Sequence, residues 1–131
     1  MVATEPSHRR LAGPDAAGEL FAPLAHEAVE VVAFVYLDEA QRVLGMRHAR
    51  SPCAGMLDLP IRDVAADAIA FDARGLVMAH NHPSGDPTPS TADREATRLL
   101  ARGLDALGVR LIDHLVVATG GVTSFRRSGF L

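Results

Sequence analysis

Apolar residues gather in four runs of strand length along the chain. The first two cover residues 31–38 and 42–48, and the polar residues between them suit the turn of a hairpin. The third run, residues 75–79, is short and almost wholly apolar, and the fourth covers residues 109–117. Runs of this length between turn-forming residues are typical of β-strands. The pattern therefore predicts four strands.

Other segments have apolar residues at helical spacing. One follows Pro60, which suits a first helical turn, and contains Ile61, Val64, Ala65, Ala68 and Ile69. The segment from Thr91 to about Leu107 is amphipathic and stops before Gly108, so it predicts a second helix. A shorter helix is expected around Ala16–Ala28, with an interruption near Pro23.

The order of these elements predicts an α/β fold in which helices flank a mixed β-sheet. With 131 residues, of which 48% are hydrophobic, the chain is long enough for one domain with a substantial core, and we expect no second domain. The first 14 residues are polar and contain Pro and Gly, so they predict a mobile leader.

Two histidines, a serine and an aspartate stand where the third strand gives way to the long helix. Side chains two apart on a strand point the same way, so His80 and His82 can aim at one point. Pro83 ends the strand, and Asp93 falls in the first turn of the helix. Two imidazoles and one carboxylate leave a tetrahedral zinc ion one open position for water, as in catalytic sites. The segment predicts a metal site.

A simpler interpretation stands beside the metal site. Residues 90–93 match a capping box, in which Ser90 caps the helix and Asp93 occupies the third helical position. Ser90 can serve both roles, because a hydroxyl accepts one hydrogen bond while its hydrogen donates another. For Asp93 the two interpretations compete. The two histidines, taken alone, could also be surface residues.

The spacing of His80, His82, Ser90 and Asp93 is that of the JAMM metallopeptidase motif of the JAB1/MPN/Mov34 superfamily. Within it, His-Asn-His-Pro-Ser-Gly followed by Pro-Ser resembles the bacterial RadC branch, as do residues 111–117 and 123–129. The resemblance implies a RadC-like JAB (MPN) domain over residues 27–131, behind a variable leader over residues 1–26.

The family motif also requires a glutamate upstream, at the start of a strand. Glu30 stands immediately before the first strand, whereas Glu27 lies three residues further away and is the weaker candidate. An ordinary solvated charge is the alternative for Glu30. The resemblance implies Zn²⁺ as the cofactor, bound by His80, His82 and Asp93, and hydrolysis of a peptide or isopeptide bond.

In this mechanism zinc activates a water molecule, Glu30 is the general base and then the general acid, and Ser90 donates a hydrogen bond to the developing oxyanion. A peptide or protein is the expected substrate. Two alternatives remain open: a non-catalytic JAB/MPN scaffold, which the intact motif argues against, and a DNA-repair-associated accessory factor, which the family name suggests.

The chain also departs from RadC proteins, which usually carry an N-terminal helical domain that we expect to be missing here. The repair label therefore transfers poorly. Residues 51–55 replace a Gly-Thr step of the family, so we expect them to line the substrate groove differently.

His114 follows an aspartate in the last strand. Strict alternation predicts that it shares a face with Arg110, Ile112 and Val116, which favours a satisfied, partly buried histidine over a fourth metal ligand. His8, His26 and His48 have no spaced partner and are expected at the surface.

Net charge and cysteine content limit the kinds of binding partner and the cellular compartment that we expect. A net charge of −3 does not favour sequence-independent binding to duplex DNA. Cys53 is the only cysteine, so no intrachain disulfide forms and the cytoplasm of a bacterium is the expected compartment. The N-terminus lacks the apolar core of a signal peptide, and no apolar run is long enough to span a membrane.

Overall fold

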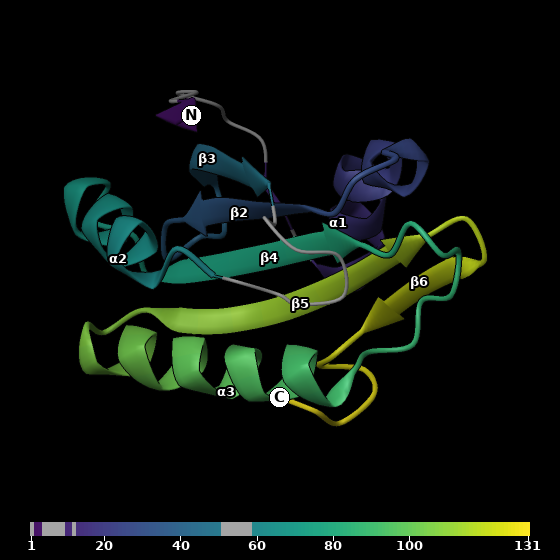
Figure 1. Cartoon of the computed structure of the whole chain (residues 1–131). Coiled ribbons are helices and arrows are strands. Elements are labelled where there is room, and N and C mark those ends of the chain that lie inside the picture. Colours follow the sequence, from purple (N-terminus) through teal and green to yellow (C-terminus); the bar gives the residue numbers. More distant parts are fainter. Residues whose placement is uncertain (1, 4–9, 12, 51–58) are drawn as a thin grey trace.

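A computed structural model describes residues 2–3, 10–11, 13–50 and 59–131. These residues build a six-stranded mixed sheet with the order β1-β3-β2-β4-β5-β6 (Figure 1). The strands are β1 (Val2–Ala3), β2 (Val31–Leu37), β3 (Val43–Arg50), β4 (Gly75–Asn81), β5 (Arg110–Ala118) and β6 (Gly121–Ser124). Strands β4 and β5 are parallel, and the other neighbouring pairs are antiparallel. The predicted α/β class with a mixed sheet is confirmed.

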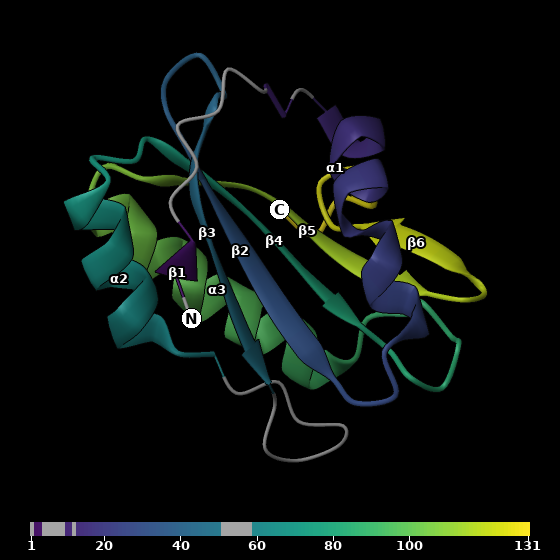
Figure 2. The same ribbon diagram turned by 90° about the horizontal axis from the view of Figure 1, so that it is seen from above.

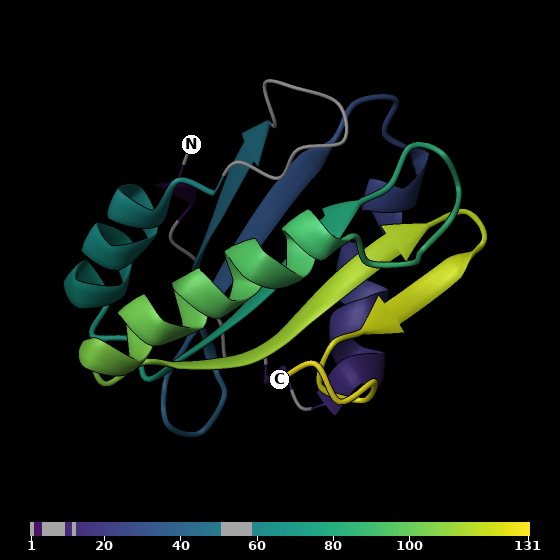
Figure 3. The ribbon, with the colours of Figure 1, turned by 60° about the horizontal axis from the view of Figure 1, so that its bottom comes forward.

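Helices cover both faces of the sheet (Figures 2 and 3). Helix α1 (Gly13–Phe21) and the 3₁₀ helix η1 (Ala22–His26) lie on one face, and α2 (Ile61–Ala70) and α3 (Thr91–Ala106) lie on the other. Pro23 stands in the first turn of η1, so the predicted interruption is the change from α- to 3₁₀-helix. Gly108 follows α3 with φ +73°, a conformation that favours glycine.

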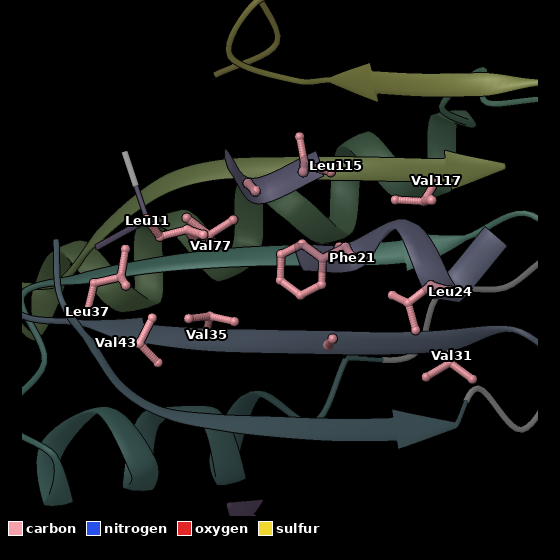
Figure 4. Packing of buried hydrophobic residues seen from close by; sticks show 13 residues of the cluster. Leu11, Phe21, Leu24, Val31, Val35, Leu37, Val43, Val77, Leu115 and Val117 are labelled. Carbon is pink, nitrogen blue, oxygen red and sulfur yellow. The ribbon is translucent and has the colours of Figure 1, made fainter. Parts of the chain in front are cut away.

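The central strands are buried on both faces, because each face carries its own apolar cluster. Odd-numbered residues of β2 and β4, with Leu115 and Val117 of β5, pack with α1 and η1; Figure 4 shows Val35, Val77 and Leu115 around Phe21. Even-numbered residues of β2 and β4 pack with α2 and α3. Burying each of the large apolar side chains contributes about 1.5–3 kcal/mol to folding, and β2 and β4 lie at the centre of both clusters.

The N-terminal segment contributes to this core. Leu11 is buried, donates its backbone N–H to Gln41 and packs in the same cluster as Phe21 and Leu24. A mobile leader is therefore the wrong description of residues 10–11, and residues 13–14 of the predicted leader belong to α1. The predicted boundary between the leader and the domain, at residues 26 and 27, stays a prediction, but Leu11, Ala17, Phe21 and Leu24 share the core with the sheet. Residues 51–55, at the predicted groove, lie outside the described part of the chain.

A β-bulge changes the face on which His114 lies. Leu111 pairs with Leu76 and Asp113 pairs with Val77, so Ile112 is the extra residue. Ile112 packs on the α1 side, whereas His114 contacts Thr97 of α3 on the opposite side. The prediction that His114 and Ile112 share a face is wrong, because the bulge breaks the alternation on which it depended.

A half-buried carboxylate, that of Asp67, ties α2 to the sheet. Asp67 of α2 accepts hydrogen bonds from Tyr36 (2.7 Å) and from both Nε and Nη2 of Arg47. Burial of Asp67 would raise its pKa, but the hydrogen bonds from Arg47 and Tyr36 outweigh it and hold this pKa below its ordinary value. Val64 and Ala68 are the buried residues of α2, while Ile61 and Ile69 are exposed. Because only two residues of α2 are buried, the hydrogen bonds of Asp67 contribute to holding this helix on the sheet.

Replacing Asp67 by Asn should lower the free energy of unfolding by about 1–3 kcal/mol, because Arg47 loses its charged partner. Since the pKa of Asp67 is lowered, this contribution is present above about pH 4 and is lost as the pH falls through the folded-state pKa. Urea unfolding at pH 7 and pH 3 measures both effects. Asp63→Asn is the matched control, because Asp63 is exposed and lies 4.0 Å from Arg47. Equal effects of the two substitutions would contradict the assignment.

Candidate metal centre

Four side chains meet where β4 ends and β2 begins. Glu30 precedes β2, His80 and His82 stand at the end of β4, and Asp93 lies in the first turn of α3. Strand β2 is antiparallel to β4, with Val32 opposite His80, so continuing this register brings Glu30 level with His82. One potential ligand atom from each of the four side chains lies within 4.8 Å of the others. The structure thus brings together four of the five site residues that the sequence predicted; Ser90, the fifth, is the N-cap of α3.

The spacing of the three predicted ligands fits a tetrahedral ion. His80 Nε2 and His82 Nε2 are 3.0 Å apart, and Asp93 places one oxygen 3.2 Å from His82 Nε2 and the other 3.5 Å from His80 Nε2. Ligands about 2.0–2.1 Å from a tetrahedral zinc ion are about 3.3 Å from one another. Glu30 Oε1 is further away, 3.9 Å from His80 Nε2. These donors can hold a divalent cation.

The charge of the cluster suits a cation as well. Burial of Asp93 would raise its pKa, but the neighbouring imidazoles of His80 and His82 outweigh it and hold this pKa well below its ordinary value. The hydrogen bond with Asp93 in turn raises the pKa of His82. Glu30 and Asp93 are both buried carboxyl residues. An ionised carboxylate is therefore already directed at the two imidazoles.

The capping box and the ligand cluster use Asp93 together. Ser90 Oγ accepts a hydrogen bond from the Asp93 N–H (3.0 Å), and Asp93 Oδ2 accepts one from the Ser90 N–H (2.8 Å). The same carboxylate faces His80 and His82. Our expectation that the two roles compete is wrong, because a carboxylate has about four lone pairs and can accept from the backbone while it faces an ion. The cap orients the carboxylate.

A backbone carbonyl orients His82. Its Nδ1 lies 2.9 Å from the carbonyl oxygen of Asp86, which can only accept a hydrogen bond, so Nδ1 carries the proton. In the neutral ring Nε2 then presents a lone pair to the cluster. The loop that supplies this carbonyl is itself fixed, because the Gly120 N–H donates to Gly85 O (2.9 Å) and a Cβ at Gly120 would lie 2.4 Å from that oxygen.

Asn81 is a residue whose importance the sequence did not reveal. Its Oδ1 accepts from the Val31 N–H (2.6 Å), and its Nδ2 donates to the carbonyls of Val29 (2.8 Å) and Glu27 (3.2 Å). These bonds fix the main chain on both sides of Glu30. Asn81 is fully buried, and a polar residue at the end of an apolar strand was the only available signal.

His114 lies behind the cluster and not in it. It is fully buried, which exceeds the partial burial that we predicted, and contacts His80 Nδ1 through Nε2 (2.6 Å) and Thr97 Oγ1 through Nδ1 (2.7 Å). Burial lowers the pKa of His114 well below its ordinary value. The expectation of a satisfied histidine outside the ligand set agrees with this geometry. His26 and His48 are exposed as predicted, and His8 lies outside the described residues.

Fold and cluster together define a class: an α/β domain with a candidate metal site at the junction of a central strand and a helix. The model of the RadC-like JAB domain family matches residues 11–130, and the chain belongs to this family.

Relatives include UPF0758 proteins of Symbiobacterium thermophilum (39% identical over 122 residues; 92% of this chain, 52% of the relative), Pseudomonas fluorescens (38% over 112; 86% and 50%) and Cupriavidus pinatubonensis (42% over 108; 82% and 47%). The chain thus spans about half the length of these curated relatives. Their names specify no reaction.

Among the described residues, no helix has the length and apolar character needed to cross a membrane.

Asp93→Asn should weaken zinc binding at least about tenfold, because it removes the only carboxylate among the three predicted ligands. Ser90→Ala is the matched control: it removes the hydroxyl that caps the helix and costs about 1 kcal/mol of stability. It keeps the backbone N–H that holds the Asp93 carboxylate, so the zinc affinity should stay within about threefold. Elemental analysis after dialysis, with chelator competition and thermal unfolding, measures all three quantities. Full zinc retention by Asp93→Asn would remove Asp93 from the ligand set.

Asn81→Ala should lower the free energy of unfolding by about 2 kcal/mol or more, because three main-chain groups lose a buried partner. Asn81→Asp keeps the acceptor for Val31 and lacks the two donors, so it separates the two halves of the contact. Chemical unfolding of both variants measures the effect. A cost below about 0.5 kcal/mol in both would show that Asn81 does not hold this segment.

Proposed function

We propose that this chain is a zinc-dependent hydrolase that cleaves an amide bond in a peptide or protein, a metallopeptidase or isopeptidase of the JAMM type. The observation that carries the proposal is the buried cluster of Glu30 with His80, His82 and Asp93. Two imidazoles and one carboxylate are a ligand set that suits zinc among the common divalent ions. Membership in the RadC-like JAB family supports the same reaction class.

A bound zinc ion would acidify a water molecule and polarise the scissile carbonyl. Glu30 would act as the general base that takes a proton from the attacking water. Its carboxylate lies beside His80 at the start of a fully buried strand, and Asn81 fixes the backbone on both sides. The protonated Glu30 would then return the proton to the departing amine.

Ser90 would stabilise the developing oxyanion. It is exposed at the N-terminus of α3, next to the cluster that Asp93 joins. Its Oγ accepts from the Asp93 N–H, so its own hydrogen can donate to a substrate oxygen. The positive end of the α3 dipole lies at the same place and favours negative charge there.

The structural observations favour the enzyme over the two alternatives. A non-catalytic scaffold does not require two carboxyl side chains to be buried beside two imidazoles, since burying such groups costs free energy unless they are paired or bind a metal. A net charge of −3 gives no support to DNA binding. The single cysteine, Cys53, supports the cytoplasm as the proposed compartment.

Glu30→Gln should keep its zinc and lose hydrolysis by a factor of about 10² or more, because glutamine cannot take up a proton. Glu27→Gln is the matched control, since Glu27 is exposed and is not part of the cluster of four. The probe is a pooled library of unstructured peptides, with and without isopeptide linkages, and the readout is mass spectrometry of the products.

A zinc-loaded wild-type protein that cleaves no member of the library would favour the scaffold. Full activity of Glu30→Gln would exclude Glu30 as the base.

A further inference from the structure

The second ring nitrogen of His80 has an unusual partner. His82 donates its Nδ1 proton to a carbonyl, whereas His80 Nδ1 faces another imidazole, Nε2 of His114, at 2.6 Å. A carbonyl can only accept, so it decides which nitrogen of His82 is protonated. An imidazole can accept or donate, so His114 alone does not decide the protonation of His80. A further group must do so.

Thr97 is that further group. Its hydroxyl donates to the backbone carbonyl of Asp93, four residues earlier in α3, at 2.6 Å. A hydroxyl has one hydrogen, and the carbonyl cannot supply another. The contact of 2.7 Å between Thr97 Oγ1 and His114 Nδ1 therefore requires His114 Nδ1 to donate.

The remaining assignments follow from the number of protons. His114 is fully buried and stacks on Phe125, with ring centroids 4.3 Å apart and an angle of 22° between the planes, so an added charge would be costly there. A neutral imidazole has one N–H, and because His114 carries it on Nδ1, its Nε2 accepts. His80 Nδ1 must then donate to it, which leaves a lone pair on His80 Nε2.

The nearby Asp113 does not compete for the His114 ring. Its carboxylate accepts from the His114 backbone N–H (2.7 Å), the Ser124 hydroxyl (2.6 Å) and the Arg126 N–H (3.0 Å). These bonds hold the turn that places Phe125 on the imidazole. The ring of His114 is thus enclosed by an aromatic side chain, a hydroxyl and the ring of His80.

We infer that Thr97 and His114 form a hydrogen-bond relay that fixes His80 as the Nδ1–H tautomer and thereby presents its Nε2 to the metal. Both are positioning residues, and neither lies in the cluster of four. The relay begins at the backbone carbonyl of Asp93, whose carboxylate faces the same ion site. The inference rests on the proposed metal site only for its effect on affinity; the tautomer is a property of the metal-free protein.

Thr97→Val removes the hydroxyl at nearly constant shape, and Thr97→Ser is the matched control that keeps it. Long-range ¹H–¹⁵N spectra of the histidine rings in metal-free protein should show the His80 proton on Nδ1 in the wild type and in Thr97→Ser, and a mixture of tautomers in Thr97→Val. Zinc affinity, measured by competition with a chromophoric chelator, should fall about tenfold or more in Thr97→Val and stay within about threefold in Thr97→Ser.

A second pair of variants tests the same relay in case Thr97→Val does not fold. His114→Gln offers a carbonyl oxygen that can accept from His80 Nδ1, so it should keep the tautomer and most of the zinc affinity. His114→Leu offers no acceptor and should lose both. A purely structural role for these residues would change thermal stability without changing the tautomer.

The relay is overturned if His80 of the wild type carries its proton on Nε2, or if Thr97→Val leaves both the tautomer and the affinity unchanged. A wild-type protein that binds no zinc would instead overturn the proposed function, while the spectra would still decide the relay. If the protein binds zinc and shows the expected tautomers but hydrolyses nothing, the relay would be supported and only the proposed peptidase activity would be contradicted.

Discussion

Strand β4 is buried on both faces, yet polar side chains stand at its end. The need of these side chains for hydrogen-bond partners determines how the surrounding segments are arranged. A buried polar group without a hydrogen-bond partner lowers the free energy of unfolding by a few kcal/mol, so each of these side chains needs a partner. His80 bonds to His114, Asn81 bonds to the main chain around Glu30, and His82 bonds to the carbonyl of Asp86. Each partner comes from a different part of the chain. The hydrogen bonds at the end of β4 therefore connect this strand to β5, to the segment before β2 and to the loop that contains Asp86.

In the helix that follows, one residue, Asp93, likewise serves two purposes. The cap of α3 uses the backbone and one oxygen of Asp93, and the carboxylate that completes the capping box is the one that faces the two imidazoles. A capping box orders the first turn, which is also the part of a helix where a side chain is held most closely in register with the loop before it. The geometry of the candidate metal centre therefore depends on the same contacts that start the helix, and the carbonyl of Asp93 connects these contacts to Thr97 and His114.

The C-terminal segment closes the buried side of the site. Asp113 binds the turn after β6, which seats Phe125 on His114, and Phe130 packs edge-on against Phe125. Arg94 of α3 lies over the Phe130 ring. This arrangement excludes water from the imidazole behind His80, and in such surroundings a hydrogen bond is stronger than it is in water. The last residues of the chain thus belong to the environment of the candidate metal centre.

Local patterns in the sequence determined four of the six strands, the helices, the ends of α3 and three residues of the cluster, because periodicity, capping and the His-x-His…Ser-x-x-Asp spacing act over a few residues. They did not predict the short strands β1 and β6, and Glu30 was predicted only through the family motif. What only the tertiary structure decided depends on groups far apart in the chain: the packing of Leu11 and of helices α1 and η1 in the core, the contact of Asn81 with Val31, and the relay from Thr97 to His114. The bulge at Ile112 is the clearest case, since it reverses the face of His114 and results from pairing with β4. The sequence placed the candidate ligands because strand and helix geometry aim them; their orientation depends on long-range hydrogen bonds, which form only when separate elements meet.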